Sequence, residues 1–212
     1  MKNITNFINE RLHITTKSHI HHYTCQPETW DELREIIVTR IYDDGFECDL
    51  NDIDVSKIKD MSYLFNASGN SIFERFNGDV SQWNVSNVTN MRWMFKGCKK
   101  FNCDISYWDV SNVKDMENMF YMCKKFNCDL SRWDVSKVTN MECMFCKCAQ
   151  FNCDISRWNI SNVKNIYRMF KDCKLFKQNL NRWNVSNIDY TVEAFKRCPT
   201  TPNWYNRNTC EP

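Results

Sequence analysis

A repeat of 25 residues most constrains what this chain can fold into. Five units aligned on tryptophan follow one another without insertion and start at Ser81, Ser106, Ser131, Ser156 and Asn181. An earlier unit, which starts at Asn51, lacks the tryptophan and carries about five extra residues. A fixed period places each residue beside its counterpart one repeat later, as in a solenoid whose coils share a core. The repeat therefore predicts a solenoid of about six coils over residues 46–198.

Apolar residues that recur at one position of the unit identify the inner side of the coils. The clearest such columns are Trp83/Trp108/Trp133/Trp158/Trp183, Phe95/Phe120/Phe145/Phe170/Phe195 and Phe76/Phe101/Phe126/Phe151/Phe176. A column of short polar residues, Asn77/Asn102/Asn127/Asn152, is expected to hydrogen-bond backbone groups where the chain changes direction. Both kinds of column indicate structure rather than catalysis.

Two spacings within the unit predict its secondary structure. Met116, Met119 and Phe120 stand at i, i+3 and i+4, which is typical of one face of a short helix. Trp108 and Val110 alternate with polar residues, which is typical of a short strand. The predicted fold class is therefore an α/β repeat solenoid in which each coil contributes one short strand and one short helix.

The two ends of the chain are expected to cap the coils, because a solenoid otherwise exposes apolar ends. In the N-terminal cap, residues 1–45, Thr29 and Glu32 form a capping box, and apolar spacing predicts a helix over 30–42 that stops at Gly45. A short helix near Ile4 and a strand over 18–25 are expected before it. Residues 199–212, which include two aromatic side chains, are expected to cap the C-terminal end.

The units, with the pattern FNxDISxWDVSNVxxMxxMFxxC, resemble the BspA-type repeats of bacterial leucine-rich-repeat-like proteins, a family often described as surface proteins. The resemblance covers roughly residues 51–198. It implies a right-handed, leucine-rich-repeat-like solenoid and the recognition of other macromolecules, including adhesion where members are exported.

Composition argues against several classes of function. The chain has 28 basic and 26 acidic residues, a formal net charge of +2, which disfavours a dedicated binder of nucleic acid. Its 4 glycines are a poor supply for a phosphate-binding loop, and no Gly-x-Ser-x-Gly elbow is present. We therefore expect no enzymatic activity and no cofactor.

The N-terminal sequence lacks the apolar core and cleavage site of a secretory signal, and no apolar run reaches membrane length. These features predict a cytoplasmic protein with reduced thiols and no membrane span. Surface exposure is the alternative that the family resemblance implies.

The 13 cysteines are the most reactive residues of the chain. Most fall into repeat columns and are interpreted as compact buried residues at corners. Cys143, Cys146, Cys148 and Cys153 stand apart as candidate ligands for a soft metal, with the first two expected to be exposed, although no second close pair completes a zinc pattern. The histidine patch of His19, His21 and His22 is interpreted as part of a cap strand, and a metal-binding or proton-transfer pair of His19 and His21 is the alternative. We expect no metal site.

Variation confined to outward columns favours a recognition surface. The candidate contacts are Gln82, Tyr107, Arg132, Arg157 and Arg182, together with Asp109 and Asp134 two positions further along the unit. Arginine beside tyrosine is a common composition of protein-binding hot spots. A solvated face whose arginines pair with the Asp column is an equal alternative.

The leading hypothesis is a non-enzymatic protein–protein interaction module. A cell-surface adhesin that binds host matrix or glycoprotein, and nucleic-acid binding through the Arg and Lys columns, are the alternatives. The chain is expected to be a monomer or a homodimer joined edge to edge, since exposed terminal strands can pair with another sheet.

Overall fold

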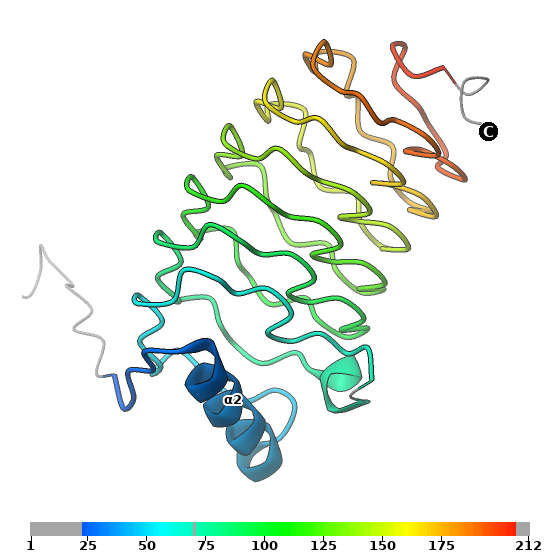
Figure 1. Cartoon of the computed structure of the whole chain (residues 1–212). Coiled ribbons are helices and arrows are strands. Elements are labelled where there is room, and N and C mark those ends of the chain that lie inside the picture. The colour runs from blue at the N-terminus through cyan, green and yellow to red at the C-terminus, as the bar shows by residue number, and fades with distance from the viewer. Residues whose placement is uncertain (1–22, 70, 207–212) are drawn as a thin grey trace, which may run out of the picture.

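The computed structural model describes residues 23–69 and 71–206, which form a stack of coils that rises from α2 at one end to the C-terminal residues at the other (Figure 1). Its helices are α2 (Trp30–Asp44) and the short 3-10 helix η1 (Ser71–Arg75). Among the described residues no strand forms, and isolated parallel bridges such as Asn90 with Asp115 connect successive coils instead. The predicted α/β architecture, with one strand and one helix in every coil, is therefore wrong.

Linked turns replace the helix predicted from the Met and Phe spacing. Met94 N donates to Met91 O at 3.2 Å, and Cys98 N donates to Phe95 O at 3.0 Å. The third residue of each turn has a positive φ, as in type II turns. Two columns share this conformation: Trp93, Asn118, Cys143, Arg168 and Glu193 in the first turn, and Gly97, Met122, Lys147, Asp172 and Arg197 in the second. Two such turns repeat apolar residues at i, i+3 and i+4 as a helix would.

Hydrogen bonds between coils explain why the turns form. The amides of alternate residues donate to carbonyls of the next coil at 2.7–2.9 Å, in the pairs Met91 to Asp115, Trp93 to Glu117, Phe95 to Met119 and Gly97 to Tyr121. A helix would use the same amides within its own segment and leave the coils unconnected. The left-handed conformation costs a non-glycine residue roughly 1–2 kcal/mol. The connections between coils offset that cost.

A turn also replaces the predicted strand. Trp108 N donates to Ile105 O at 3.2 Å, so Tyr107 lies on the outer side of the turn while Trp108 is buried. The Trp108 indole N–H then donates to Val80 O of the preceding coil at 3.0 Å. The equivalent bond recurs for Trp83, Trp133, Trp158 and Trp183 at 2.8–3.1 Å. The tryptophan column therefore connects coils as well as filling the core.

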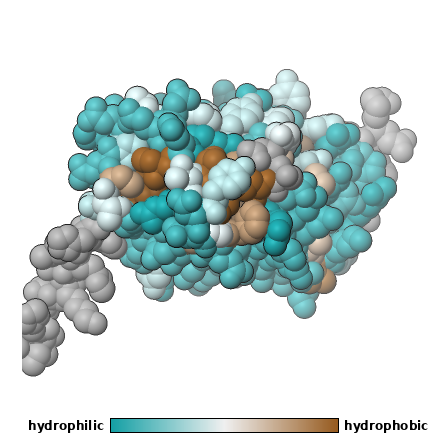
Figure 2. Space-filling view, turned by 90° about the horizontal axis from the view of Figure 1, so that it is seen from below, coloured by the Kyte–Doolittle hydropathy of each residue, from teal (hydrophilic) through white to brown (hydrophobic). Residues whose placement is uncertain are grey.

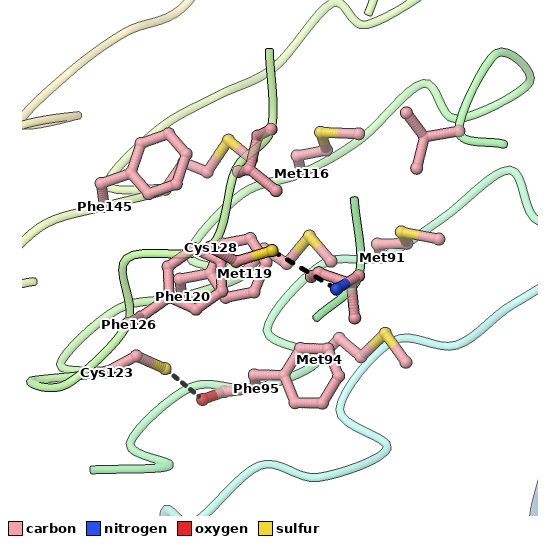
Figure 3. Packing of buried hydrophobic residues seen from close by; sticks show 14 of the residues in the cluster. Met91, Met94, Phe95, Met116, Met119, Phe120, Cys123, Phe126, Cys128 and Phe145 are labelled. Carbon is pink, nitrogen blue, oxygen red and sulfur yellow. Dashed lines mark hydrogen bonds between the residues drawn. The ribbon is translucent and has the colours of Figure 1, made fainter. Parts of the chain in front are cut away.

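Aromatic rings and thiols fill the space inside the coils, and the columns predicted to face inward are buried. The rings of Phe95 and Phe120 stack with centroids 5.8 Å apart, and Phe120 lies 4.0 Å from Phe126 (Figure 3). The Cys123 thiol donates to Phe95 O at 2.9 Å, and the sulfur of Cys128 accepts from Ile105 N at 3.3 Å (Figure 3). Cysteine is thus more than a compact buried residue here, because it satisfies backbone groups of neighbouring coils.

The asparagine side chains accept hydrogen bonds from the backbone, as predicted, and these bonds also connect the coils. Each Oδ1 accepts the backbone N–H of the counterpart residue one coil later, as in the bond from Asn127 N to Asn102 Oδ1 at 2.7 Å. The same contact joins Asn77 to Asn102, Asn127 to Asn152 and Asn152 to Lys177 at 2.7–2.9 Å. These side chains are therefore committed to the fold.

Helix α2 covers the N-terminal end of the stack. Thr29 Oγ1 caps the helix by accepting from Glu32 N at 3.2 Å. The helix extends to Asp44, two residues beyond the expected last residue Tyr42, and stops at Gly45, at φ +89°, as predicted. Leu33, Ile37 and Ile41 are its buried residues. Figure 2 views this end and shows apolar residues gathered in one area among hydrophilic ones. The short helix expected near Ile4 lies outside the described residues, as does most of the strand expected over 18–25. The described end of that strand forms only the isolated parallel bridge of Cys25 with Ile53.

Two side chains of α2 replace the backbone donors that a preceding coil would supply. In later coils, the carbonyls equivalent to those of Ser62 and Leu64 accept backbone N–H groups. Here the Trp30 indole N–H donates to Ser62 O at 2.9 Å, and the Arg34 guanidinium donates to Leu64 O. The guanidinium also lies 3.9 Å from the ring centroid of Phe73, in η1. The first coil is therefore capped by specific contacts.

At the C-terminal end Trp204 continues the tryptophan column. Its ring stacks on Trp183 with centroids 6.5 Å apart, and its indole N–H donates to Leu180 O at 2.9 Å. Tyr205 packs edge-on against Phe195 at 5.0 Å. These two rings cover the apolar end of the last coil.

We expect Arg34→Ala to lower the free energy of unfolding by about 1.5–3 kcal/mol, the range for a hydrogen bond that involves a charged group. The substitution leaves Leu64 O without its donor and removes the cation from the Phe73 ring. Urea denaturation checks this. Glu35→Ala, at an exposed position of the same helix, is the matched control and should change stability by less than about 0.5 kcal/mol. Equal effects of the two substitutions would contradict the capping role.

Candidate functional site

The outward residues predicted as contacts form one row along the stack, which we call the arginine row: Gln82, Tyr107, Arg132, Arg157 and Arg182. Each is the third residue of the turn that ends in a tryptophan, as in the bonds from Trp133 N to Leu130 O and from Trp158 N to Ile155 O, both 3.1 Å. The turn buries the tryptophan and exposes its predecessor. Tyr107 is accordingly 76% exposed.

The stacking distance of the coils sets the spacing of this row. The rings of Trp133 and Trp158, next to Arg132 and Arg157, are parallel to within 3° with centroids 6.5 Å apart. The guanidinium of Arg132 lies 5.6 Å from the ring centroid of Tyr107 in the preceding coil. The row therefore presents one side chain per coil at a regular interval.

The three arginines of the row form no ion pair with any described residue. Within residues 23–69 and 71–206, neither an ion pair nor a side-chain hydrogen bond engages Arg132, Arg157 or Arg182. The alternative of pairing with the predicted Asp column is therefore not observed. Asp109 and Asp134 instead accept the backbone N–H of Ser111 and Ser136, each at 3.0 Å.

The structure brings the arginine row beside a second row of acidic residues, Asp104, Asp129 and Asp154, which the sequence reasoning missed. Each accepts the amide of the serine two residues later, at 2.9–3.0 Å. The sulfurs of Cys128 and Cys153 contact Asp104 and Asp129 at 3.6 Å. The repeated sequence Asn-Cys-Asp could have indicated this row, but its residues were expected only to form a corner of the coil.

Hydrogen bonds keep these carboxylates ionised. The backbone N–H of Ser131 lowers the pKa of Asp129, with further contributions from the Ser131 side chain and, more weakly, Arg132. The backbone N–H of Ser156 lowers the pKa of Asp154 in the same way, and Arg157 adds to the effect. The two rows therefore place fixed negative charges beside unpaired positive charges.

Two open hollows lie between the rows. The larger, of 580 Å³, is lined by Asn127, Asp129, Ser131, Arg132, Cys153, Asp154 and Arg157. The second, of 380 Å³, is lined by Asn102, Asp104, Ser106, Tyr107, Cys128, Asp129 and Arg132. Because both include Asp129 and Arg132, the hollows are adjacent and form one groove across three coils. Three of the predicted contacts, Tyr107, Arg132 and Arg157, thus meet at this groove. Gln82 and Arg182 line neither hollow.

The four candidate metal ligands do not converge. Cys148 donates to Phe120 O at 2.9 Å, and the sulfur of Cys153 accepts from Leu130 N at 3.1 Å. Cys143 and Cys146 are 8% and 2% exposed, so the expectation that both are exposed is wrong. No group of three or more His, Cys, Asp or Glu residues within the described chain could hold a metal ion. His19, His21 and His22 lie outside the described residues.

Across the part of the chain that the structure describes, no helix combines the length and apolar character needed to cross a bilayer.

Comparison with known proteins places the chain in a repeat family. No curated protein and no solved structure matches it. One family model matches twice, over residues 38–142 and 104–206, in overlapping segments that together cover most of the chain. The overlap is what a repeated unit produces, since the same model can align at more than one register. The chain therefore belongs to the family described as Mycoplasma protein of unknown function, DUF285.

Proposed function

We propose that the chain is a non-enzymatic recognition module that binds an extended, acidic segment of a protein partner along the arginine row. The observation that carries the proposal is the set of three successive exposed arginines that form no ion pair with described residues, two of which, Arg132 and Arg157, line an open groove. An unpaired guanidinium offers several hydrogen-bond donors in a planar arrangement that suits carboxylates. The resemblance of the units to BspA-type repeats, a family that recognises macromolecules, supports the same function.

The spacing of the row suits an extended chain. Equivalent tryptophan rings of adjacent coils are 6.4–6.5 Å apart. Alternate side chains of an extended peptide are about 6.6–6.8 Å apart, because each residue adds roughly 3.3–3.4 Å. A peptide that runs along the stack can therefore place one acidic side chain opposite each arginine.

The fixed carboxylates give the groove a second specificity. Asp129 and Asp154, which border the groove opposite the arginines, repel acidic groups on their side and attract polar or basic groups there. We therefore expect acidic residues of the partner, opposite the arginines, to alternate with uncharged polar residues that face Asp104, Asp129 and Asp154.

Simultaneous replacement of Arg132, Arg157 and Arg182 by alanine should weaken binding of a labelled peptide with alternating Glu and Thr by about tenfold. Exposed charge pairs contribute roughly 0.2–1 kcal/mol each, and about 1.4 kcal/mol corresponds to a factor of ten in Kd. Fluorescence anisotropy at low ionic strength measures the change. A peptide of the same composition with consecutive Glu residues tests the spacing.

The matched control replaces three exposed lysines on another corner, Lys100, Lys124 and Lys125, and makes the same change in net charge. We expect this variant to bind the alternating peptide as the original chain does. Equal loss in the two variants, or equal affinity for the two peptides, would indicate general charge attraction and overturn the assignment of the arginine row.

A further inference from the structure

The pair Cys143 and Cys146 occupies two columns whose side chains touch each other in other coils. Lys96 Nζ lies 3.4 Å from the ring centroid of Trp93, and Lys196 forms an ion pair with Glu193. In each case the two residues are three apart, at the same positions of the unit as the two cysteines. The fold therefore brings the side chains of these columns together, and in this coil both side chains are thiols.

The backbone geometry of the pair suits a disulfide. Cys146 N donates to Cys143 O at 3.0 Å, which closes a four-residue turn. Such a turn holds its first and fourth Cα atoms within about 7 Å, and a disulfide joins Cα atoms that are about 4.4–6.8 Å apart. The cysteines of the repeat columns differ, because each bonds to the backbone of a neighbouring coil, as Cys148 does with Phe120 O.

The two thiols are also chemically unequal. A hydrogen bond from Cys143 lowers the pKa of Cys146, and the nearby Lys147 and Lys171 add to the effect. The same bond and burial raise the pKa of Cys143, which keeps its proton. Burial raises the pKa of Cys148 well above its ordinary value, so that thiol stays protonated. A lowered pKa favours the thiolate, the reactive form of cysteine.

We propose that Cys143 and Cys146 form a redox site that a small peroxide oxidises to an intramolecular disulfide. The exposed fractions of 8% and 2% admit hydrogen peroxide more readily than a bulky disulfide reagent. The Cys146 thiolate attacks one peroxide oxygen, the O–O bond breaks, and the departing hydroxide takes a proton to become water. The sulfur of Cys143 then attacks the resulting sulfenic acid, the S–S bond forms, and the second water leaves with the Cys143 proton. Two thiols and one peroxide thus give one disulfide and two waters.

The sequence allows a direct test on the intact chain. Trypsin releases residues 138–147, which contain these two cysteines and no others, and residues 148–157, which contain only Cys148 and Cys153. The folded protein is exposed to increasing hydrogen peroxide, quenched, denatured, alkylated and digested. We expect peptide 138–147 to lose two hydrogen atoms and both alkyl labels by mass spectrometry. Peptide 148–157 should keep both labels, and dithiothreitol should restore the labels of the first peptide.

Two results would overturn the proposal. One is a peptide 138–147 that keeps both labels while cysteines elsewhere are oxidised. The other is parallel loss of label from both peptides, which would indicate unfolding or unselective oxidation. In the Cys143→Ser variant, whose Cys146 has no resolving thiol, we expect sulfenic or sulfinic acid at Cys146 instead of the disulfide. The result on the unmodified chain decides the proposal even where this variant fails to fold.

Discussion

Replacement of Phe120 by alanine is expected to lower the free energy of unfolding by about 3–5 kcal/mol, the usual range for a buried Phe→Ala change. Phe120 is fully buried in the middle of the stack. Its ring stacks on Phe95 and Phe145, each at 5.8 Å, and on Phe126 at 4.0 Å. The cavity would thus open between three consecutive coils, and the repeat offers no neighbouring side chain that could fill it without leaving its own layer.

Urea denaturation followed by tryptophan fluorescence measures this effect, since the Trp133 ring lies 6.4 Å from Phe120. Phe120→Leu keeps most of the volume and is the matched control, with an expected cost of under about 1.5 kcal/mol. Tyr107→Ala, on the exposed side of the same coil, should change stability by less than about 0.5 kcal/mol. A loss at Phe120 as small as that at Tyr107 would contradict a continuous aromatic core.

The sequence was sufficient to predict which residues face inward. A column that keeps one apolar residue type through successive units cannot face solvent in one coil and the core in the next. Trp108 and Phe120 are buried accordingly. Near the C-terminal end the pattern weakens, because Val185 and Ile188 are only partly buried. The repeat predicts burial well because the side-chain types of a column indicate whether it faces the core, whatever the backbone conformation.

Backbone conformation could not be predicted in the same way. Apolar residues at i, i+3 and i+4 lie together both on a helix and in two linked turns, so Met116, Met119 and Phe120 fit either structure. The hydrogen bonds from alternate amides to the next coil favour the turns over the helix. The sequence of a single unit carries no information about these bonds. The one local sequence signal for turns was Gly97, because glycine favours a positive φ. Gly97 has a φ of +80°, and the non-glycine residues of its column share a positive φ.

The candidate site shows the same division. Variation among the exposed residues predicted Tyr107 and Arg132 as candidate contacts, and both line the groove. The constancy of Asp104 and Asp129 hid their place beside the groove, because a repeated polar residue looked purely structural. The exposure of Cys143 was predicted wrongly from its column: Asn118, at the same position, is also buried. A polar residue in a column does not show that the column is exposed when neighbouring coils cover it.

Removal of one complete unit, residues 131–155, is expected to leave a chain that still folds cooperatively. The deletion joins Leu130 to Ser156, so every column continues in register, with Trp158 in the place of Trp133. The contacts of α2 with the first coil and of Trp204 with the last coil are untouched. Because each coil contacts only its neighbours, the loss amounts to one coil and its net contribution. The dependence of unfolding free energy on urea should decrease roughly in proportion to the residues removed.

A shorter deletion, of residues 131–142, is the opposing test and should abolish cooperative folding although it removes fewer residues. It eliminates Trp133 and Met141 from one coil, together with the amide and carbonyl groups that bond to the coils on either side. The coils above and below would then face unpaired backbone groups, each of which costs about 1–3 kcal/mol when buried. Circular dichroism and thermal melting of the two variants compare them directly. If the shorter deletion were the better tolerated one, connections between equivalent residues of successive coils would not be what holds the chain together.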